Sequence, residues 1–163
     1  TEVARRAGVS RMTIYRSWAD MPTLLGDLMT REWSGIVDQT TDVPQPSDPV
    51  DGLVEQVLAT VHALRTNELF VRIVEVDPEL VLPYLLSRRG RSQDHVLSVL
   101  VAAIEAAQAA GLVRPGRPTA IARALVLTVH GFVLSAHTMV DDDLTEAELD
   151  DELRLVVTRV LAA

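Results

Sequence analysis

The residues best suited to binding chemistry lie near the start of the chain, on one short predicted helix. Arginine side chains offer charged donors in a fixed fork, and Ser, Thr and Tyr hydroxyls both donate and accept hydrogen bonds. Such groups on one helix suit phosphate oxygens and the edges of bases. The candidate binding residues are Ser10, Arg11, Met12, Thr13, Tyr15 and Arg16.

The charge of the chain is distributed unevenly. The 163 residues carry a net charge of −8. Residues 1–19 hold four arginines against Glu2, which gives this segment +3 and leaves −11 for the rest. A basic end on an acidic body indicates that one small region meets an anion while the remainder faces solvent.

Several chemistries are excluded by composition. The chain has no cysteine and all 15 basic residues are Arg, so thiolate sites, disulfides and a Schiff-base or phosphate-loop lysine are absent. His130 and His137 lie too far apart for the usual metal-binding pair of histidines, and no spacing groups a nucleophile with a base. We therefore expect no cofactor, no metal and no enzymatic activity. The apolar stretches are shorter than a membrane span and no export signal is present, which predicts a soluble, cytoplasmic protein without a membrane partner.

Apolar residues recur every three or four positions, which predicts an all-α fold. Ser92 is the expected cap of a helix that Gly111 stops, and Thr145 with Glu148 forms a capping box. The proline-rich stretch 40–49 divides the chain into predicted domains 1–40 and 41–163. Beyond it, helices are predicted over residues 48–67, 68–76, 79–88 with an interruption at Pro83, 92–110, 118–140 and 145–161.

Residues 3–18, VARRAGVSRMTIYRSW, predict a helix-turn-helix. Gly8 can take the positive φ that ends the first helix, and Val9 is expected to fill the angle between the helices. Ser10 caps the second helix, which buries Ile14 and Trp18. An ordinary corner between two helices with exposed arginines is the alternative.

The stretch VARRAGVSRMTIYRSWADMPTLL resembles the tetracycline-repressor (TetR) family of transcriptional regulators, most specifically at Thr-Ile-Tyr-Arg followed by an aromatic residue. The lactose-repressor family shares the turn but continues into an α/β domain, which the rest of this chain does not resemble. The resemblance implies a truncated N-terminal helix-turn-helix, with its first helix missing, followed by a helical ligand-binding and dimerisation domain. Met21 stands where the family usually has a lysine.

By this resemblance the protein is a DNA-binding transcriptional regulator. It would be a repressor that binds a palindromic double-stranded DNA operator, and a small-molecule effector would release the repressor from that operator. The effector would tilt the helix expected over residues 22–40, and an apolar or weakly cationic compound suits an acidic, aliphatic body. A helical ligand-binding or interaction module that does not bind DNA is the alternative. The candidate ligand-binding residues, which an ordinary core would also explain, are Trp33, His62, Phe70, Tyr84 and His130.

Two helical segments predict a homodimer. Residues 120–136 are apolar on nearly every side, and the last helix carries an apolar stripe, so a four-helix interface between two subunits would cover both. A monomer with an aliphatic core is the alternative. The candidate interface residues are Gly131, Ser135, Leu149, Leu153, Val156 and Val160.

Overall fold

A computed structural model describes residues 2–41 and 48–163 of the chain, and within these ranges it contains helices and no strand. The all-α prediction is therefore confirmed. Two short 3₁₀ turns lie at Pro78–Leu80 and Ala136–Thr138. The α-helices are α1 (Glu2–Arg6), α2 (Arg11–Ser17), α3 (Met21–Thr41), α4 (Pro49–Thr66), α5 (Glu68–Val76), α6 (Leu82–Leu86), α7 (Arg91–Ala109), α8 (Pro118–Ser135) and α9 (Glu146–Leu161).

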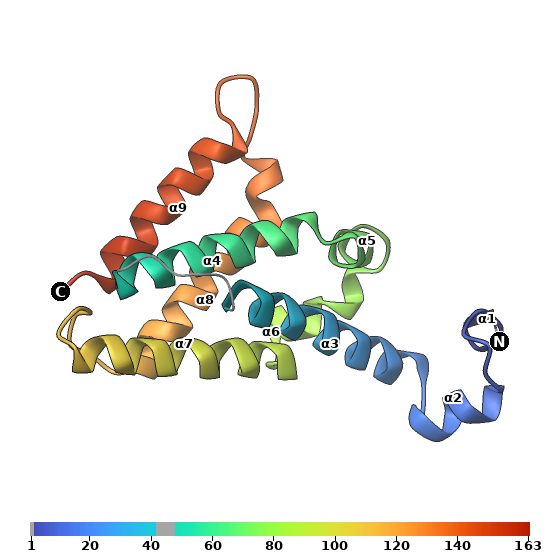
Figure 1. The fold of residues 1–163 in the computed structure, drawn as a ribbon. Coiled ribbons are helices and arrows are strands. Elements are labelled where there is room, and N and C mark those ends of the chain that lie inside the picture. The colour runs from blue at the N-terminus through green and yellow to red at the C-terminus, as the bar shows by residue number, and fades with distance from the viewer. Residues whose placement is uncertain (1, 42–47) are drawn as a thin grey trace.

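The helices form a small head and a larger body joined by α3 (Figure 1). Helices α1 and α2 lie at the outer end of α3, away from the rest of the chain. The other end of α3 packs on α4 and α7, while α7 packs on α8 and α4 packs on α9. Helix α3 thus links the head to the body.

Two apolar clusters hold the body together. The larger joins α4, α7, α8 and α9, because each contributes side chains with no exposed surface. The smaller cluster centres on Met29, Ile73 and Val81, with Trp33 and Tyr84 packed against it. It lies where α3 meets α5 and the 78–86 segment, so the helix that carries the head also forms part of the body's core. The largest fully buried side chains of the molecule are Val61, Ile104, Leu125, Leu153, Val157 and Leu161.

Several predicted helix ends are confirmed. The Asp48 carboxylate accepts a hydrogen bond from the Val50 amide at 2.7 Å and begins α4. Gly111 adopts a φ of +73° directly after α7, where a residue with a side chain would be strained. Helix α5 has the predicted bounds, and Pro83 lies in the first turn of the short α6, after the 3₁₀ turn.

Three local predictions need correction. Gly90 caps α7 instead of Ser92: the Gln93 Oε1 accepts the Gly90 amide at 2.8 Å, and Ser92 is buried inside the first turn. The helix predicted over 118–140 ends at Ser135, because the backbone tightens there into a 3₁₀ turn and the Met139 amide bonds the Ala136 carbonyl at 2.8 Å. Most of the predicted linker, residues 42–47, lies outside the described residues, and its first positions, Thr40 and Thr41, belong to α3.

Replacing Thr145 with alanine should lower the free energy of unfolding by about 1 kcal/mol. The Thr145 hydroxyl accepts from the Glu148 amide at 3.3 Å, and the Glu148 carboxylate accepts from the Thr145 amide at 2.8 Å, which completes the predicted capping box of α9. Chemical denaturation would measure the change. Thr145→Ser keeps the hydroxyl and should retain most of this stability, so equal losses in both variants would contradict the role of the cap.

Candidate nucleic-acid interface and ligand cavity

The turn between α1 and α2 has the geometry of a helix-turn-helix. Gly8 has a φ of +66°, and the Val9 amide then bonds the Ala4 carbonyl at 3.0 Å. The Ser10 hydroxyl accepts from the Thr13 amide at 3.1 Å and so begins α2. Val9 does not fill the interhelical angle as expected, since 41% of its surface is exposed.

Helix α2 presents most of the predicted binding residues to solvent. Arg11 and Arg16 are exposed and, within the described part of the chain, neither forms an ion pair. Met12 and Tyr15 are 74% and 63% exposed, so both can also reach a partner. The Thr13 hydroxyl is less accessible, because it lies 2.9 Å from the Ser10 hydroxyl.

The arginines of α1 differ from those of α2. Arg5 and Arg6 both bond the carboxylate of Glu2, the latter at 2.9 Å. Their charge is therefore largely balanced within α1. The two guanidinium groups left to attract an anion at the head are those of Arg11 and Arg16.

A chain of hydrogen bonds connects the end of α2 to the body. The indole Nε1 of Trp18, the residue that ends α2, donates to Asp27 Oδ2 of α3 at 2.9 Å. The other carboxylate oxygen of Asp27 accepts from the guanidinium of Arg91, the first residue of α7. These two partners hold the pKa of the Asp27 carboxyl below its usual range, so it is ionised at neutral pH.

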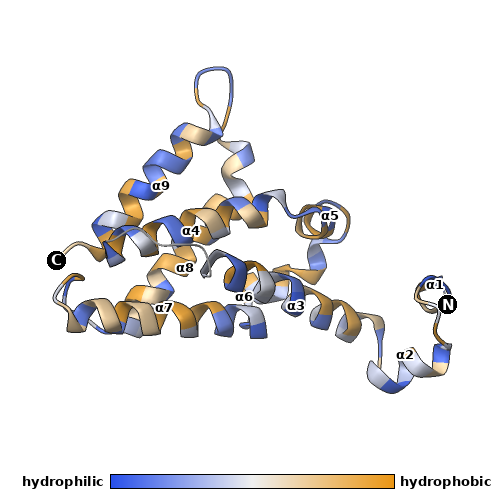
Figure 2. Cartoon of the chain, viewed as in Figure 1, coloured by the Kyte–Doolittle hydropathy of each residue, from blue (hydrophilic) through white to orange (hydrophobic). Residues whose placement is uncertain are grey.

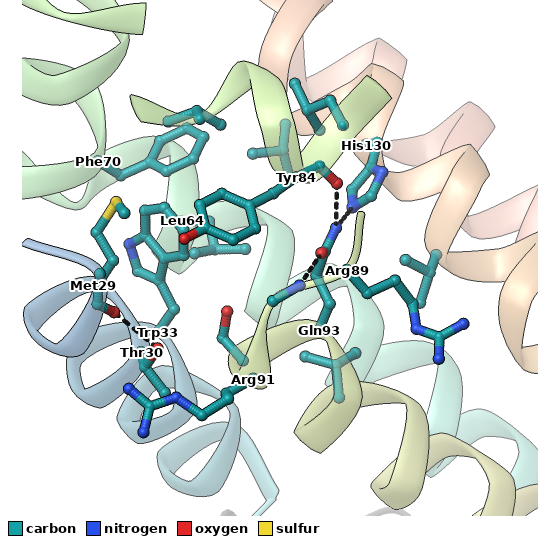
Figure 3. Close-up of a pocket in the computed structure, with 18 of the residues that line it drawn as sticks. Met29, Thr30, Trp33, Leu64, Phe70, Tyr84, Arg89, Arg91, Gln93 and His130 are labelled. Atoms are coloured by element: carbon teal, nitrogen blue, oxygen red, sulfur yellow. Dashed lines mark hydrogen bonds between the residues drawn. The ribbon is translucent and has the colours of Figure 1, made fainter. Parts of the chain in front are cut away.

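A cavity of about 840 Å³ lies in the body beside this connection (Figure 3). Of the five predicted ligand residues, four line it: Trp33, Phe70, Tyr84 and His130. His62 does not, because its side chain is exposed on α4. The walls come from α3, α4, α5, α6, α7 and α8, and the volume lies within the range of small-molecule sites.

Tyr84 lies between two glycines at the opening of the cavity. A Cβ on Gly90 would lie 3.0 Å from its ring, and a Cβ on Gly26 of α3 would lie 3.7 Å from its hydroxyl. The Arg88 guanidinium lies over the same ring, 5.2 Å from its centroid. The hydroxyl of Tyr84 thus lies close to Gly26 of α3, and its ring lies close to Gly90, the residue before α7.

Gln93 and His130 form a polar wall opposite the aromatic residues (Figure 3). The Gln93 Nε2 donates to the Tyr84 backbone carbonyl at 3.1 Å and lies 3.5 Å from His130 Nε2. Burial lowers the pKa of His130, so the imidazole is uncharged at neutral pH. Sequence reasoning missed Asp27, Arg91 and Gln93, and Asp27 and Arg91 are 64 positions apart, with no local pattern to connect them.

The predicted interface residues do not all lie on one surface. Gly131 and Ser135 are exposed on α8, Val156 is 37% exposed on α9, and Leu149 and Val160 are half-buried. Leu153 has no exposed surface, because it packs into the chain's own core, so it offers nothing to a second subunit. Other exposed apolar residues of α8, of the segment after it and of α9 are Leu127 at 71%, Met139 at 62% and Leu155 at 48%.

Helix α8 is strongly apolar (Figure 2). With the 3₁₀ turn after it, it spans Pro118–Thr138, which is long and apolar enough to cross a membrane by length and composition alone. Core helices of soluble proteins pass the same test, and only 28% of this stretch is buried. The helix therefore carries an apolar face that the described part of the chain leaves without a partner.

No cluster of three metal-ligating side chains occurs among the described residues.

A helix-turn-helix with exposed arginines, joined to a helical body that contains a cavity, is the arrangement of a DNA-binding regulator. No protein-family model matches the chain. It is 36% identical over 152 residues to an HTH-type transcriptional regulator of Mycobacterium tuberculosis, covering 93% of this chain and 77% of that protein. A regulator of the same description from Mycobacterium bovis is 34% identical over the same shares.

Solved structures share the fold. The transcriptional repressor QsdR of R. erythropolis, from the TetR family, superposes with a TM-score of 0.67 at 16% identity, over 97% of this chain and 81% of that one. A protein of unknown function from Rhodococcus sp. RHA1 gives 0.69 at 22% identity, over 99% and 84%. The chain belongs to the HTH-type transcriptional regulators, and its fold is that of a TetR-family repressor of known structure. It is a DNA-binding regulator and not an enzyme, and a module that does not bind DNA is not favoured.

Proposed function

We propose that this regulator is a cytoplasmic, homodimeric repressor that binds a palindromic operator and leaves it when a small molecule fills the cavity. One observation carries the release step: α3 lines the cavity through Met29 and Trp33, and its Asp27 also accepts the hydrogen bond from Trp18 at the end of α2. A ligand that favours one position of α3 must change the affinity of the head for DNA, and DNA must change the ligand's affinity by the same factor.

The homodimer rests on the poorly covered face of α8 and α9. Leu127 is exposed on α8, one turn before the small residue Gly131 and two turns before Ser135, and Leu155 and Val156 are exposed on α9. Small side chains allow two helices to approach closely, and burial of the apolar ones supplies the driving force. Two subunits related by a two-fold axis would place two copies of α2 on half-sites of a palindrome.

The proposal is tested with the protein expressed from its complete gene and the DNA upstream of that gene. A mobility shift should show saturable binding that competitor DNA of unrelated sequence does not remove. Compounds that raise the melting temperature of the protein are then titrated into the complex. We expect a coupling of about 1–3 kcal/mol, that is, a 5- to 150-fold loss of DNA affinity. A tight ligand that leaves DNA affinity unchanged would show that the two sites are independent.

Replacing Asp27 with alanine should uncouple the cavity from the head. The variant loses both the Trp18 and the Arg91 hydrogen bonds, while the apolar contacts of α3 with the body remain. Asp27 also lines the cavity, but its side chain is 43% exposed and so lies at the rim. Ligand affinity should therefore change little, whereas the ligand-induced loss of DNA affinity should fall to a few-fold or less. Parallel titrations of ligand into free protein and into the DNA complex measure both quantities.

Asp38→Ala is the matched control for this experiment. Asp38 also lies on α3 and also bonds α7, through His95 Nε2 at 2.7 Å, but its only described hydrogen-bond partner belongs to the body. The control removes another exposed side-chain hydrogen bond between α3 and α7 and should retain normal coupling. Equal coupling in the two variants and the parent would place the transmission elsewhere in α3.

A further inference from the structure

We propose that the effector is a largely apolar molecule whose polar end is a carboxylate, held where α7 begins. This inference rests on the proposed ligand-binding function and specifies the chemical class of the ligand. The first three residues of α7, Arg91, Ser92 and Gln93, all line the cavity, and most of the other lining side chains are aliphatic or aromatic. The amide groups at the start of a helix have no partner within the helix and carry partial positive charge, so they suit an anionic oxygen.

The side chain of Ser92 supplies a further hydrogen-bond donor at this helix end. Ser92 is only 9% exposed, and its hydroxyl has no hydrogen-bond partner among the described residues. The hydroxyl nevertheless keeps accessible surface, unlike the indole nitrogen of Trp33, which is completely buried. Because Ser92 lines the cavity, this surface opens into it. A largely buried hydroxyl without a partner is costly, so a ligand oxygen that accepts its hydrogen bond gains affinity.

No described side chain already occupies the first-turn amides of α7. Helices α4, α5 and α9 each begin with a side-chain oxygen that accepts such an amide, whereas α7 follows Gly90, which has no side chain. The Gln93 side chain is engaged elsewhere, because its oxygen accepts the Gly90 amide at 2.8 Å and its nitrogen donates to the Tyr84 carbonyl at 3.1 Å. The amides of Ser92 and Gln93 are therefore left without a partner in the described part of the chain.

Two of the three arginines near this helix end are already paired. The guanidinium of Arg91 bonds Asp27, and that of Arg89 lies 2.9 Å from the Asp94 carboxylate. Figure 3 shows the side chains of Arg89 and Arg91 extending in opposite directions from the beginning of α7. The two pairs balance their own charges, so the charge that a ligand meets here depends on the groups that remain.

Arg88 supplies a positive charge that the described part of the chain does not neutralise. It forms no ion pair with any described residue, and its guanidinium lies 5.2 Å from the centroid of the Tyr84 ring. A Cβ on Gly90 would lie 3.0 Å from the same ring, so Arg88 and the residue that precedes α7 both lie against one side chain. The uncommitted groups at this end of α7 are thus a guanidinium, a hydroxyl and backbone amides, all of which donate hydrogen bonds.

The carboxylates that line the cavity do not oppose an anion at this helix end. Asp27 is ion-paired, and Asp20 accepts an amide of the first turn of α3 at 2.8 Å. Asp77 and Glu79 are exposed and belong to the segment between α5 and α6. The proposed carboxylate therefore replaces the weakly cationic compound that the acidic character of the whole body suggested.

The experiment uses four probes with the same biphenyl body: biphenylcarboxylic acid, biphenylcarboxamide, methylbiphenyl and biphenylmethylamine. Calorimetric titration and thermal stabilisation at neutral pH measure their affinities for the protein expressed from its complete gene, in the absence of DNA. We expect the acid to bind about tenfold or more tightly than each of the others, because charge-assisted hydrogen bonds are stronger than neutral ones. Equal binding of the acid and the amide, tightest binding of the amine, or no binding by any probe would overturn the inference.

Two variants test the groups that hold the carboxylate. Ser92→Ala removes the hydroxyl and Arg88→Gln removes the charge, and each should weaken binding of the acid about fivefold or more. Methylbiphenyl should bind both variants as it binds the parent, which would show that the cavity is intact. A parent-like advantage of the acid over methylbiphenyl in either variant would contradict the proposed site.

The chain offers a matched control for each variant. Ser98 is exposed on the same helix and does not line the cavity, so Ser98→Ala should leave the preference for the acid unchanged. Arg72 is exposed on α5 and does not line the cavity either, so Arg72→Gln controls for the loss of one positive charge. A failure of the carboxylate inference leaves the DNA-release experiment unaffected, since any stabilising compound serves that test.

Discussion

Replacing Leu127 or Gly131 with arginine should convert the dimer to a monomer without unfolding the chain. Leu127 is 71% exposed, and no atom lies within 4 Å of where a Cβ on Gly131 would be, so each subunit has room for the new side chain. In the proposed dimer the charge would be buried without a partner, at a cost of about 3–5 kcal/mol. The dissociation constant of the dimer should therefore rise by about a hundredfold or more.

Sedimentation or light scattering across a dilution series measures this change. Circular dichroism should show unchanged helix content; for Gly131→Arg the monomer gains helix propensity of up to about 1 kcal/mol. Leu86→Arg is the control, since Leu86 is 78% exposed on α6, away from the α8 and α9 surface, and should leave the dimer intact. Clean dimers in both α8 variants would mean that the subunits associate elsewhere.

The monomeric variants should also lose most of their affinity for operator DNA. A dimer that binds two half-sites gains from holding both heads on one molecule, and a single head lacks this gain. Leu153→Arg would be a poor probe of the same question, because Leu153 is completely buried in the core of its own chain. Unfolding and dissociation could not be told apart in that variant.

The parts of the fold that sequence predicted well depend on chemistry between neighbours along the chain. The Thr145–Glu148 capping box, the Asp48 cap and the left-handed Gly111 each satisfy the backbone within a few residues, so their patterns are local. The cap of α7 shows the limit of this reasoning. Serine is the better general cap, but the Gln93 side chain binds the Gly90 amide and moves the start of the helix.

Contacts between distant segments could not be predicted in this way. Helix α9 has two apolar sets, and only the packing against α4 and α8 shows that Leu153 and Val157 face inward while Leu155 and Val156 face out. The connection between Asp27 and Arg91 joins α3 to α7. The cavity residues were found more readily, because the chain has only two Trp, two Tyr and two Phe, and Trp33, Phe70 and Tyr84 line one space.

Removing the guanidinium groups of Arg11 and Arg16 should give the second large effect, on operator binding. Both are exposed on α2 and lack an ion-pair partner among the described residues, whereas Arg5 and Arg6 bond Glu2. Each alanine substitution should cost about 1–3 kcal/mol if the side chain reads a guanine edge. The double variant should lose about 2–6 kcal/mol if the two contacts are independent.

Salt dependence separates the two kinds of contact that these arginines can make. Loss of a phosphate contact weakens binding to all sequences alike and lowers the slope of log affinity against log salt by about one, whereas loss of a base contact chiefly relaxes specificity.

Tyr15→Phe removes one exposed hydroxyl and should weaken binding to operator and to unrelated DNA equally. Arg72→Ala is the control for charge, because Arg72 is exposed on α5 in the body, and it should leave both measurements unchanged. Parent-like operator affinity in Arg11→Ala, Arg16→Ala and Tyr15→Phe would remove α2 from the DNA interface.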